Sequence, residues 1–371
     1  MYKIAFISPF FVLLTIFSSI GQSAKQVQFE ERYWEVAGQK HEFTTYKGKQ
    51  CIYLENGAAQ LKEGKLQNGI IDFDMAFEDA RAFLSVRFRI QNDSNFEEFY
   101  VRPHQSGNPD AMQYTPVFNG KAGWQLYHGK GYSATYSYNF GEWIHVRLII
   151  SGDQMEVFIN DMSQPILPVH DLKLTAAPGG IGFGSSLSGA YFANFSYKEM
   201  TKPTLVNKTE ALPEIAPEFI QNWQVSQELS STELAKFYQL KDFYKNNTLR
   251  WQSITPEYSG MINISQVATA SEETNTVLVK TIINSDKDQI KQLQFGYSDI
   301  ANVYVNGKII YSGQNIFRSR DYRYLGTIGF FDSVYLDLKK GDNEIIFGVT
   351  ENFGGWGLKA KLEDLDGVKL K

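Results

Sequence analysis

The chain has 371 residues, of which 43% are hydrophobic and 21% are charged. Its 36 basic and 41 acidic side chains give a net charge of −5, which argues against nucleic acid or an anionic membrane surface as the partner, since both require concentrated positive charge. Cys51 is the only cysteine, so no internal disulfide is possible and the hydrophobic cores alone must hold the fold.

The first residues have the pattern of a signal peptide. Lys3 precedes an apolar run over 4–17, and small and polar residues follow as far as Ala24. This run is too short to span a bilayer comfortably, and no later segment approaches eighteen apolar residues. We therefore expect cleavage after Gly21 or Ala24, no transmembrane anchoring, and a mature chain that is periplasmic or secreted.

The mature length, about 350 residues, exceeds what one hydrophobic core usually organises, so two domains are expected. The stretch TKPTLVNKTEALPEIAPE (201–218) lacks periodicity and contains three prolines, which is typical of a linker. These features predict a signal peptide over 1–24, a first domain over 25–200, a linker over 201–216 and a second domain over 217–371.

The first half reads as short alternating strands. FLSVRFRI (83–90) alternates apolar and polar residues, and WIHVRLIISGDQMEVFIND (143–161) is a hairpin that turns at Gly152-Asp153. GGIGFG (179–184) and AYFANFSY (190–197) supply two more strands. No long amphipathic helix is indicated, so this half is predicted to be an all-β sandwich.

The second half continues in the same way after one helical segment. SSTELAKFYQLKDFY (230–244) has helical spacing, and ANVYVNGKIIYSG (301–313) is an Asn-Gly hairpin. Further strands are predicted within 275–283, 290–298, 334–351 and 355–364. The fold class predicted for the whole chain is all-β, with two antiparallel β-sandwich (jelly-roll) domains in tandem after a signal peptide.

Both halves resemble known families. GEWIHVRLIISGDQMEVFIND (141–161) and GGIGFGSSLSGAYFANFSY (179–197) resemble the concanavalin A-like lectin/glucanase superfamily, in its laminin-G-like and 3-keto-disaccharide hydrolase-like branches. VYVNGKIIYSG (303–313) and LDLKKGDNEIIFGVTENFGGWG (336–357), with the early QNWQVS (221–226), are similar to the galactose-binding-domain-like jelly rolls that accompany bacterial glycosidases. The resemblance implies the folds more firmly than any activity, because these folds serve both enzymes and binders.

The richest polar pattern follows the strand 83–90. If this strand pairs with EEFYVRPH (97–104) through a symmetric turn, Arg89 lies opposite Glu98 and Arg87 opposite Tyr100. One face of the hairpin is then polar and the other apolar. The polar face is predicted to carry Ser85, Arg87, Arg89, Glu98, Tyr100, Arg102 and His104.

Such a face suits carbohydrate, which requires planar donors and acceptors for its hydroxyls and aromatic rings against its C–H face. The following loops would add ligand-binding residues at the same rim. These additional candidates are Gln113, Tyr114 and Trp124. The alternative is that the arginines simply pair with Glu98 on a solvated sheet surface.

Catalysis by this face is a second hypothesis, with Glu98 and His104 as the acid/base candidates of a glycoside hydrolase or lyase. Common glycosidases need two carboxylates at a defined separation, but Glu97 and Glu98 are adjacent and must point to opposite sides of a strand. The laminarinase-type Glu-x-Asp-x-x-Glu string is missing from the sequence. A third hypothesis is a structural interaction module that has no sugar site.

The second domain offers a cluster of arginines and aromatics in FRSRDYRYLG (317–326), together with a tryptophan flanked by glycines. Guanidinium groups could hold a uronate or a sulfated sugar, or an Arg–Asp network could instead fix a long loop. The candidates are Arg318, Arg320, Tyr322, Arg323 and Trp356. We expect no cofactor; both fold families often hold a structural calcium ion, for which Asp93 and Asp110 are the candidate ligands.

Overall fold

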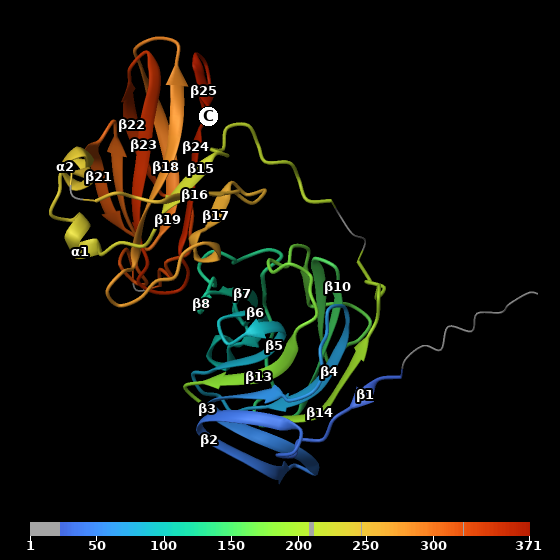
Figure 1. Cartoon of the computed structure of the whole chain (residues 1–371). Helices are drawn as coiled ribbons and strands as arrows, with labels where there is room; N and C mark the ends of the chain where they lie inside the picture. Colours follow the sequence, from blue (N-terminus) through green and yellow to red (C-terminus); the bar gives the residue numbers. More distant parts are fainter. Residues whose placement is uncertain (1–22, 208–210, 246, 322) are drawn as a thin grey trace, which may run out of the picture.

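The computed structural model describes residues 23–207, 211–245, 247–321 and 323–371. The predicted signal peptide lies almost entirely outside the described residues. None of the helices in these ranges has the length and hydropathy needed to traverse a bilayer. Strands dominate, and every strand pair within the described ranges is antiparallel (Figure 1), so the all-β prediction is confirmed.

Residues 25–199, here called the first unit, form one 14-stranded sheet. Its main path runs in the order β12-β11-β10-β4-β14-β3-β13-β5-β6-β7-β8, and β1, β2 and β9 pair at the side of this path. Its strands are β1 (Lys25–Gln26), β2 (Trp34–Tyr46), β3 (Lys49–Leu61), β4 (Gly69–Ala76), β5 (Phe83–Asn92), β6 (Asn95–Val101), β7 (Met112–Phe118), β8 (Lys121–Ala122), β9 (Ser133–Ala134), β10 (Ile144–Ser151), β11 (Gln154–Ile159), β12 (Leu167–Val169), β13 (Gly180–Ser186) and β14 (Ala190–Glu199).

Residues 223–370, the second unit, form a seven-stranded and a four-stranded sheet. The larger sheet contains β15 (Trp223–Ser226), β16 (Trp251–Ile254), β18 (Thr276–Ser285), β20 (Ile300–Val305), β21 (Lys308–Gln314), β23 (Gly341–Thr350) and β25 (Val368–Leu370). The smaller sheet contains β17 (Met261–Asn263), β19 (Gln289–Ser298), β22 (Asp332–Leu338) and β24 (Gly357–Leu362).

The helical segment 230–244 is shorter than predicted. It forms two brief helices, α1 (Ser231–Leu234) and α2 (Leu240–Tyr244), and the single-turn helices η1 (Pro103–Gln105) and η2 (Ile264–Gln266) lie elsewhere. The helix breaks because Gln239 makes a β-bridge to Lys308 and the Leu240 N–H donates to the Gly307 carbonyl. Tertiary hydrogen bonding to the β20–β21 turn therefore overrides the local helical pattern.

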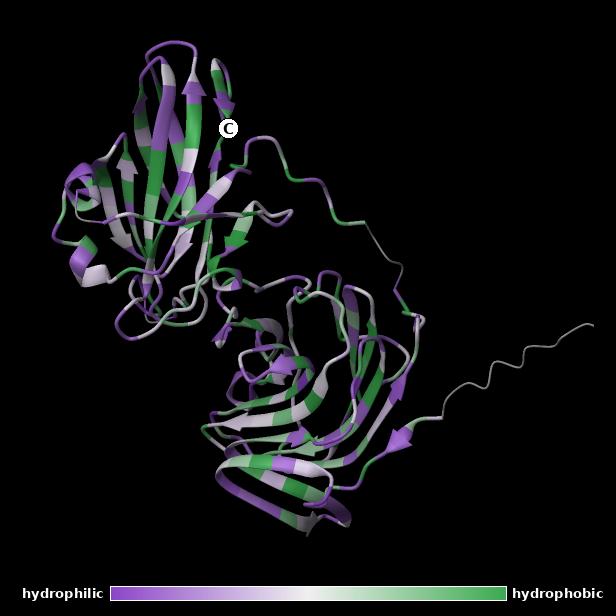
Figure 2. Ribbon diagram, viewed as in Figure 1, coloured by the Kyte–Doolittle hydropathy of each residue, from purple (hydrophilic) through white to green (hydrophobic). Residues whose placement is uncertain are grey.

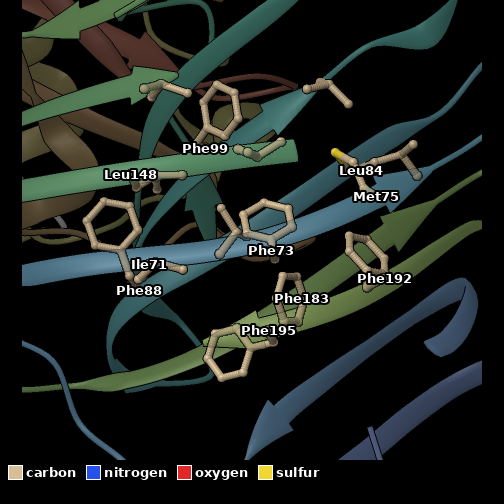
Figure 3. Packing of buried hydrophobic residues seen from close by; sticks show 14 of the residues in the cluster. Ile71, Phe73, Met75, Leu84, Phe88, Phe99, Leu148, Phe183, Phe192 and Phe195 are labelled. Atoms are coloured by element: carbon tan, nitrogen blue, oxygen red, sulfur yellow. The ribbon is translucent and has the colours of Figure 1, made fainter. Parts of the chain in front are cut away.

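The alternation of the strands puts their apolar positions in two main cores, as the bands of Figure 2 show along the strands. In β10, Ile144, Val146, Leu148 and Ile150 are at most 2% exposed, and each such burial stabilises the fold by about 2 kcal/mol. In Figure 3, Phe73 of β4 and Phe183 of β13 pack together, with ring centroids 5.1 Å apart. Since β14 and β3 lie between these two strands in the sheet order, the contact requires the sheet to curl.

The hairpins predicted at 143–161 and 301–313 are confirmed. Ser151 pairs with Gln154 around a turn in which Gly152 has φ +65°. Val305 pairs with Lys308, and Asn306 and Gly307 have φ values of +48° and +81°. Asn-Gly is favoured in such two-residue turns because both residues tolerate positive φ.

The two units meet where a loop of the first unit enters the second (Figure 1). The loop 123–128 follows β8, and its Gln125 backbone N–H donates to the Gly354 carbonyl over 2.9 Å. The Gln125 side chain donates to Leu325 O and accepts from Ser298 Oγ. Since Leu126 and Tyr127 also pack with Met261 and Ile328, this seam has its own small apolar cluster.

Candidate functional site

The β5–β6 hairpin forms, but its register is two residues away from the prediction. Arg87 lies opposite Glu98, and Ser85 lies opposite Tyr100. The regular pairing stops after Phe88, where the ladder shifts before Asn92. The predicted pairing of Arg89 with Glu98 is therefore wrong.

Arg89 does not belong to the polar face. It has φ +50° and is fully buried. Its Nε donates to the Gln67 carbonyl over 2.9 Å and its Nη2 to the Gly152 carbonyl. The positive φ turns this side chain toward the loops that precede β4 and join β10 to β11, so Arg89 fastens loops together and is unavailable to a ligand.

The accessible centre of the face is one ion pair. Arg87 Nε donates to Glu98 Oε1 over 3.0 Å, and the two side chains retain 30% and 13% of their exposure. Their strand neighbours Val86 and Phe99 point into the core, so alternation aims the pair outward. The guanidinium lies 4.8 Å from the centre of the Phe96 ring.

Strand β13 borders this pair with glycines. Gly182 pairs with Arg87, and Gly184 pairs with Ser85. A Cβ atom added at Gly184 would lie 2.7 Å from Ser85 Oγ and 2.9 Å from Arg87 Nη2. The glycines therefore leave room for the Arg87 side chain across β13. We call Ser85, Arg87, Glu98, Gly182 and Gly184 the Arg87–Glu98 face.

Three predicted ligand-binding residues are buried beside this face and do not line it. Tyr100, Arg102 and Gln113 are at most 6% exposed. Arg102 Nη1 donates to the Asp110 carbonyl, and Gln113 Nε2 donates to the carbonyl of Trp124 over 2.8 Å. Gln113 thus bonds to the loop that follows β8, while Arg102 donates to the Tyr100 hydroxyl, which donates to Gln113 Oε1. The polar groups of all three side chains are therefore used internally.

Tyr114 lies on the opposite, core side of the sheet. It is fully buried, and its hydroxyl donates to Glu97 Oε2 over 2.7 Å, while the Leu174 N–H donates to the other oxygen. Burial raises the pKa of Glu97 to about 7. The prediction that Glu97 and Glu98 point to opposite faces is thus confirmed, whereas Tyr114 as a ligand-binding residue is wrong.

His104 lies on η1, against the ring of Phe83 at a centroid distance of 5.5 Å. Partial burial and the nearby Arg81 and Arg102 charges lower the pKa of its imidazole. Within the described residues no contact joins His104 to Glu98, which pairs with Arg87 instead. The two acid/base candidates therefore do not form a dyad in this structure.

Trp124 lies at the seam between the units. Its ring is 5.6 Å from Phe353 and 6.4 Å from Phe317, both of the second unit. A buried ion pair that the sequence did not reveal lies at the same seam, where Lys173 Nζ is 2.6 Å from Glu257 Oε2. Trp124 therefore packs against aromatic side chains of the second unit.

The second-unit candidates divide between loop and core. Trp356 is fully buried, and its Nε1 donates to the Val349 carbonyl, so it fills the core. Arg320 Nε donates to Asn315 Oδ1 and its Nη2 to Asp332 Oδ2, which matches the alternative of an Arg–Asp network fixing the loop. Arg318 is exposed with its guanidinium over Phe317, and Arg323 pairs with Asp321. Tyr322 lies outside the described residues.

A second polar group on the outer side of the first unit was missed. His145 of β10 lies between two carboxylates of β4, with Nδ1 2.7 Å from Asp74 Oδ1 and Nε2 3.2 Å from Asp72 Oδ1. These carboxylates raise the pKa of His145 to about 9. Alternation in both strands was visible in the sequence, but their adjacency was not. Because each ring nitrogen of His145 already contacts a carboxylate, we interpret this group as structural.

In the part of the chain that the structure describes, no group of three or more His, Cys, Asp or Glu side chains is placed so that it could hold a metal ion. Asp93 is exposed in the β5–β6 turn, and the carbonyl of Asp110 accepts from Arg102. The suggested calcium ligands thus remain predictions.

No protein-family model matches the chain, and no curated protein matches its sequence. Solved structures resemble somewhat less than half of it. A carbohydrate-binding module, CBM66, from Bacillus subtilis is 14% identical, covers 44% of this chain and 94% of its own length, and has a TM-score of 0.36. A B. subtilis protein with a galectin-like fold is 10% identical over 47% of this chain and 98% of its own (TM-score 0.36). A β-glucanase from Bacillus licheniformis is 10% identical over 48% and 99% (TM-score 0.34). At these values the likenesses carry no argument about what this chain binds.

Proposed function

We propose that this chain is an exported carbohydrate-binding protein and that a glycan binds on the Arg87–Glu98 face. The observation that carries the proposal is the open ion pair beside a strip of glycines. Arg87 donates to Glu98 through Nε alone, so both Nη groups and Glu98 Oε2 are unused within the described residues. Two parallel donors next to a carboxylate oxygen match a pair of vicinal hydroxyls.

The surroundings give a sugar ring room and a surface to lie on. Next to the glycines of β13, strand β3 places Ala58 opposite Gly184 and Gln60 opposite Gly182, so the floor consists of small and amide side chains. Phe83 is half-buried at the end of the face beside His104. An aromatic ring at the edge of a polar floor can pack against the C–H face of a sugar.

A glycan-array screen of the protein tests the proposal, followed by calorimetric titration of the best hit. Arg87→Ala and Glu98→Ala are expected to weaken binding about tenfold or more, since a hydrogen bond to a charged group contributes roughly 1.5–3 kcal/mol. Arg250→Ala, which removes an exposed arginine of the second unit, is the matched control and should bind as the parent does.

An empty array, or unchanged affinity in both face variants, would overturn the proposal. Product analysis on each hit addresses the glycoside-active alternative. Release of product by the parent, lost in Glu98→Ala, would replace binding by catalysis on the same face.

A further inference from the structure

A separate pocket of about 210 Å³ lies on the second unit. It is lined by the end of α2, by the β16 edge of the seven-stranded sheet and by β18 and β23. Its lining residues are Tyr244, Asn247, Leu249, Trp251, Lys280 and Glu344. The volume is below the roughly 300–1,000 Å³ of drug-sized sites, so the pocket suits a ligand of about one ring.

The pocket forms where the two short helices stop covering the sheet. Leu278 of β18 and Ile346 of β23 lie beneath α1 and α2 in a small apolar cluster. Lys280 and Glu344 follow the same alternation on these two strands, and Lys280 pairs directly with Ile346 in register. Both charged side chains therefore lie on the helix-bearing face, just beyond the apolar cluster.

These two charges are not paired with each other or with any described residue in a salt bridge. Lys280 Nζ lies 4.0 Å from the centre of the Trp251 ring, and both charged side chains are only half-exposed. Among the other half-buried lysines of the second unit, Lys361 has Glu363 as a carboxylate partner, whereas Lys359 lies against the ring of Phe330. A half-buried lysine and a half-buried glutamate in one pocket are thus available to an incoming ligand.

The remaining lining residues supply groups that suit hydroxyls and a ring. Asn247 Nδ2 donates to the Phe243 carbonyl over 2.9 Å, which leaves its Oδ1 as an acceptor. The Tyr244 hydroxyl has no hydrogen-bond partner among the described residues. With the rings of Trp251 and Tyr244 in the wall, the pocket combines aromatic surface, acceptors and one ammonium group.

We infer that this pocket is a second binding site, for a single sugar unit that carries a carboxylate. Lys280 would pair with the carboxylate of the uronate, Glu344 and Asn247 would accept from ring hydroxyls, and an aromatic wall would contact the C–H face of the ring. This site uses no residue of the Arg87–Glu98 face, so it does not depend on the function proposed for that face.

Calorimetric titration of the full chain with D-galacturonate and D-glucuronate tests the inference, with D-galactose and D-glucose as neutral probes of the same ring. We expect a uronate to bind and its neutral counterpart to bind about tenfold or more weakly, because the pair with Lys280 is lost. The Trp251 fluorescence should change on binding, and Trp251→Phe should retain binding better than Trp251→Ala.

Lys280→Met removes the charge and keeps the length of the side chain, and it should weaken uronate binding about tenfold or more. Lys287→Met, an exposed lysine in the turn after β18, is the matched control and should leave it unchanged. Arg87→Ala should also leave it unchanged, which separates this site from the face on the first unit. Absence of uronate binding, equal binding of neutral sugars, or full binding by a folded Lys280→Met variant would each overturn the inference.

Discussion

Glu351 should make the stability of this protein fall as pH rises. It directly follows β23, is 3% exposed, and neither carboxylate oxygen has hydrogen-bonding geometry with a described residue. Burial and the neighbouring Asp299 charge raise its pKa to about 8, although Lys121 Nζ at 3.9 Å and the Gly355 amide favour the charged form. The folded protein therefore holds a proton here that the unfolded chain releases near pH 4.5.

The direction and size of this change in the free energy of unfolding follow from proton linkage. A carboxyl whose folded pKa exceeds its unfolded value contributes its full stability below the unfolded pKa and loses it as pH rises through the folded one. The interval from 4.5 to about 8 at Glu351 corresponds, at 1.36 kcal/mol per pH unit, to about 5 kcal/mol. Glu97 and Asp299, whose pKa values are raised by burial to about 7 and about 6, act in the same direction.

The variant Glu351→Gln keeps the shape of the protonated side chain and removes its titration. We expect its free energy of unfolding to match that of the parent near pH 5 and to exceed it by several kcal/mol at pH 9. Urea unfolding followed by both tryptophan fluorescence and circular dichroism measures this difference. Glu273→Gln, an exposed glutamate, is the control and should follow the parent at every pH. Equal slopes of unfolding free energy against pH for Glu351→Gln and the parent would refute the reasoning.

Three further predictions concern other parts of the molecule. Gly184→Ala places a Cβ atom 2.9 Å from Arg87 Nη2. It should weaken glycan binding severalfold and lower the free energy of unfolding by about 1–3 kcal/mol; an unchanged affinity in calorimetry would contradict this prediction. Lys173→Met leaves Glu257 buried without its partner at the seam and should destabilise the protein by about 3–5 kcal/mol in urea, whereas Lys130→Met should not. Asp72 and Asp74 raise the pKa of His145 to about 9, so its NMR titration midpoint should lie near 9. The stability that this ion pair adds should be complete below pH 6.5 and lost as pH rises through 9. A midpoint near 6.5 would exclude the ion-pair geometry.

The strands and tight turns were predictable because their signals are local. Alternation in 83–90 and 143–161 identifies the buried side of each strand, and Asn306-Gly307 identifies a turn whose φ values only a few residues tolerate. The register of the β5–β6 pair was not predictable. It depends on the irregular step at Arg89, a non-glycine residue with positive φ that alternation cannot reveal.

The candidate site was predictable only in part, for a different physical reason. The sequence assigns Arg87 and Glu98 to one face, and the structure places them there as an ion pair. It also assigns Arg102 to that face and Gln113 to its rim, but both are buried: Gln113 donates to the loop that follows β8, and Arg102 donates to the Asp110 carbonyl. Burial against a loop leaves no trace in the alternation of a strand.

Hydrogen–deuterium exchange of the protein with and without its best glycan tests most directly whether the Arg87–Glu98 face binds sugar. The account predicts that bound glycan slows exchange in the peptides that contain 83–101 and 180–186, and that this protection disappears in Arg87→Ala. Protection confined to other segments, such as 70–76 with 144–151 around His145, would contradict it and move the glycan to another surface.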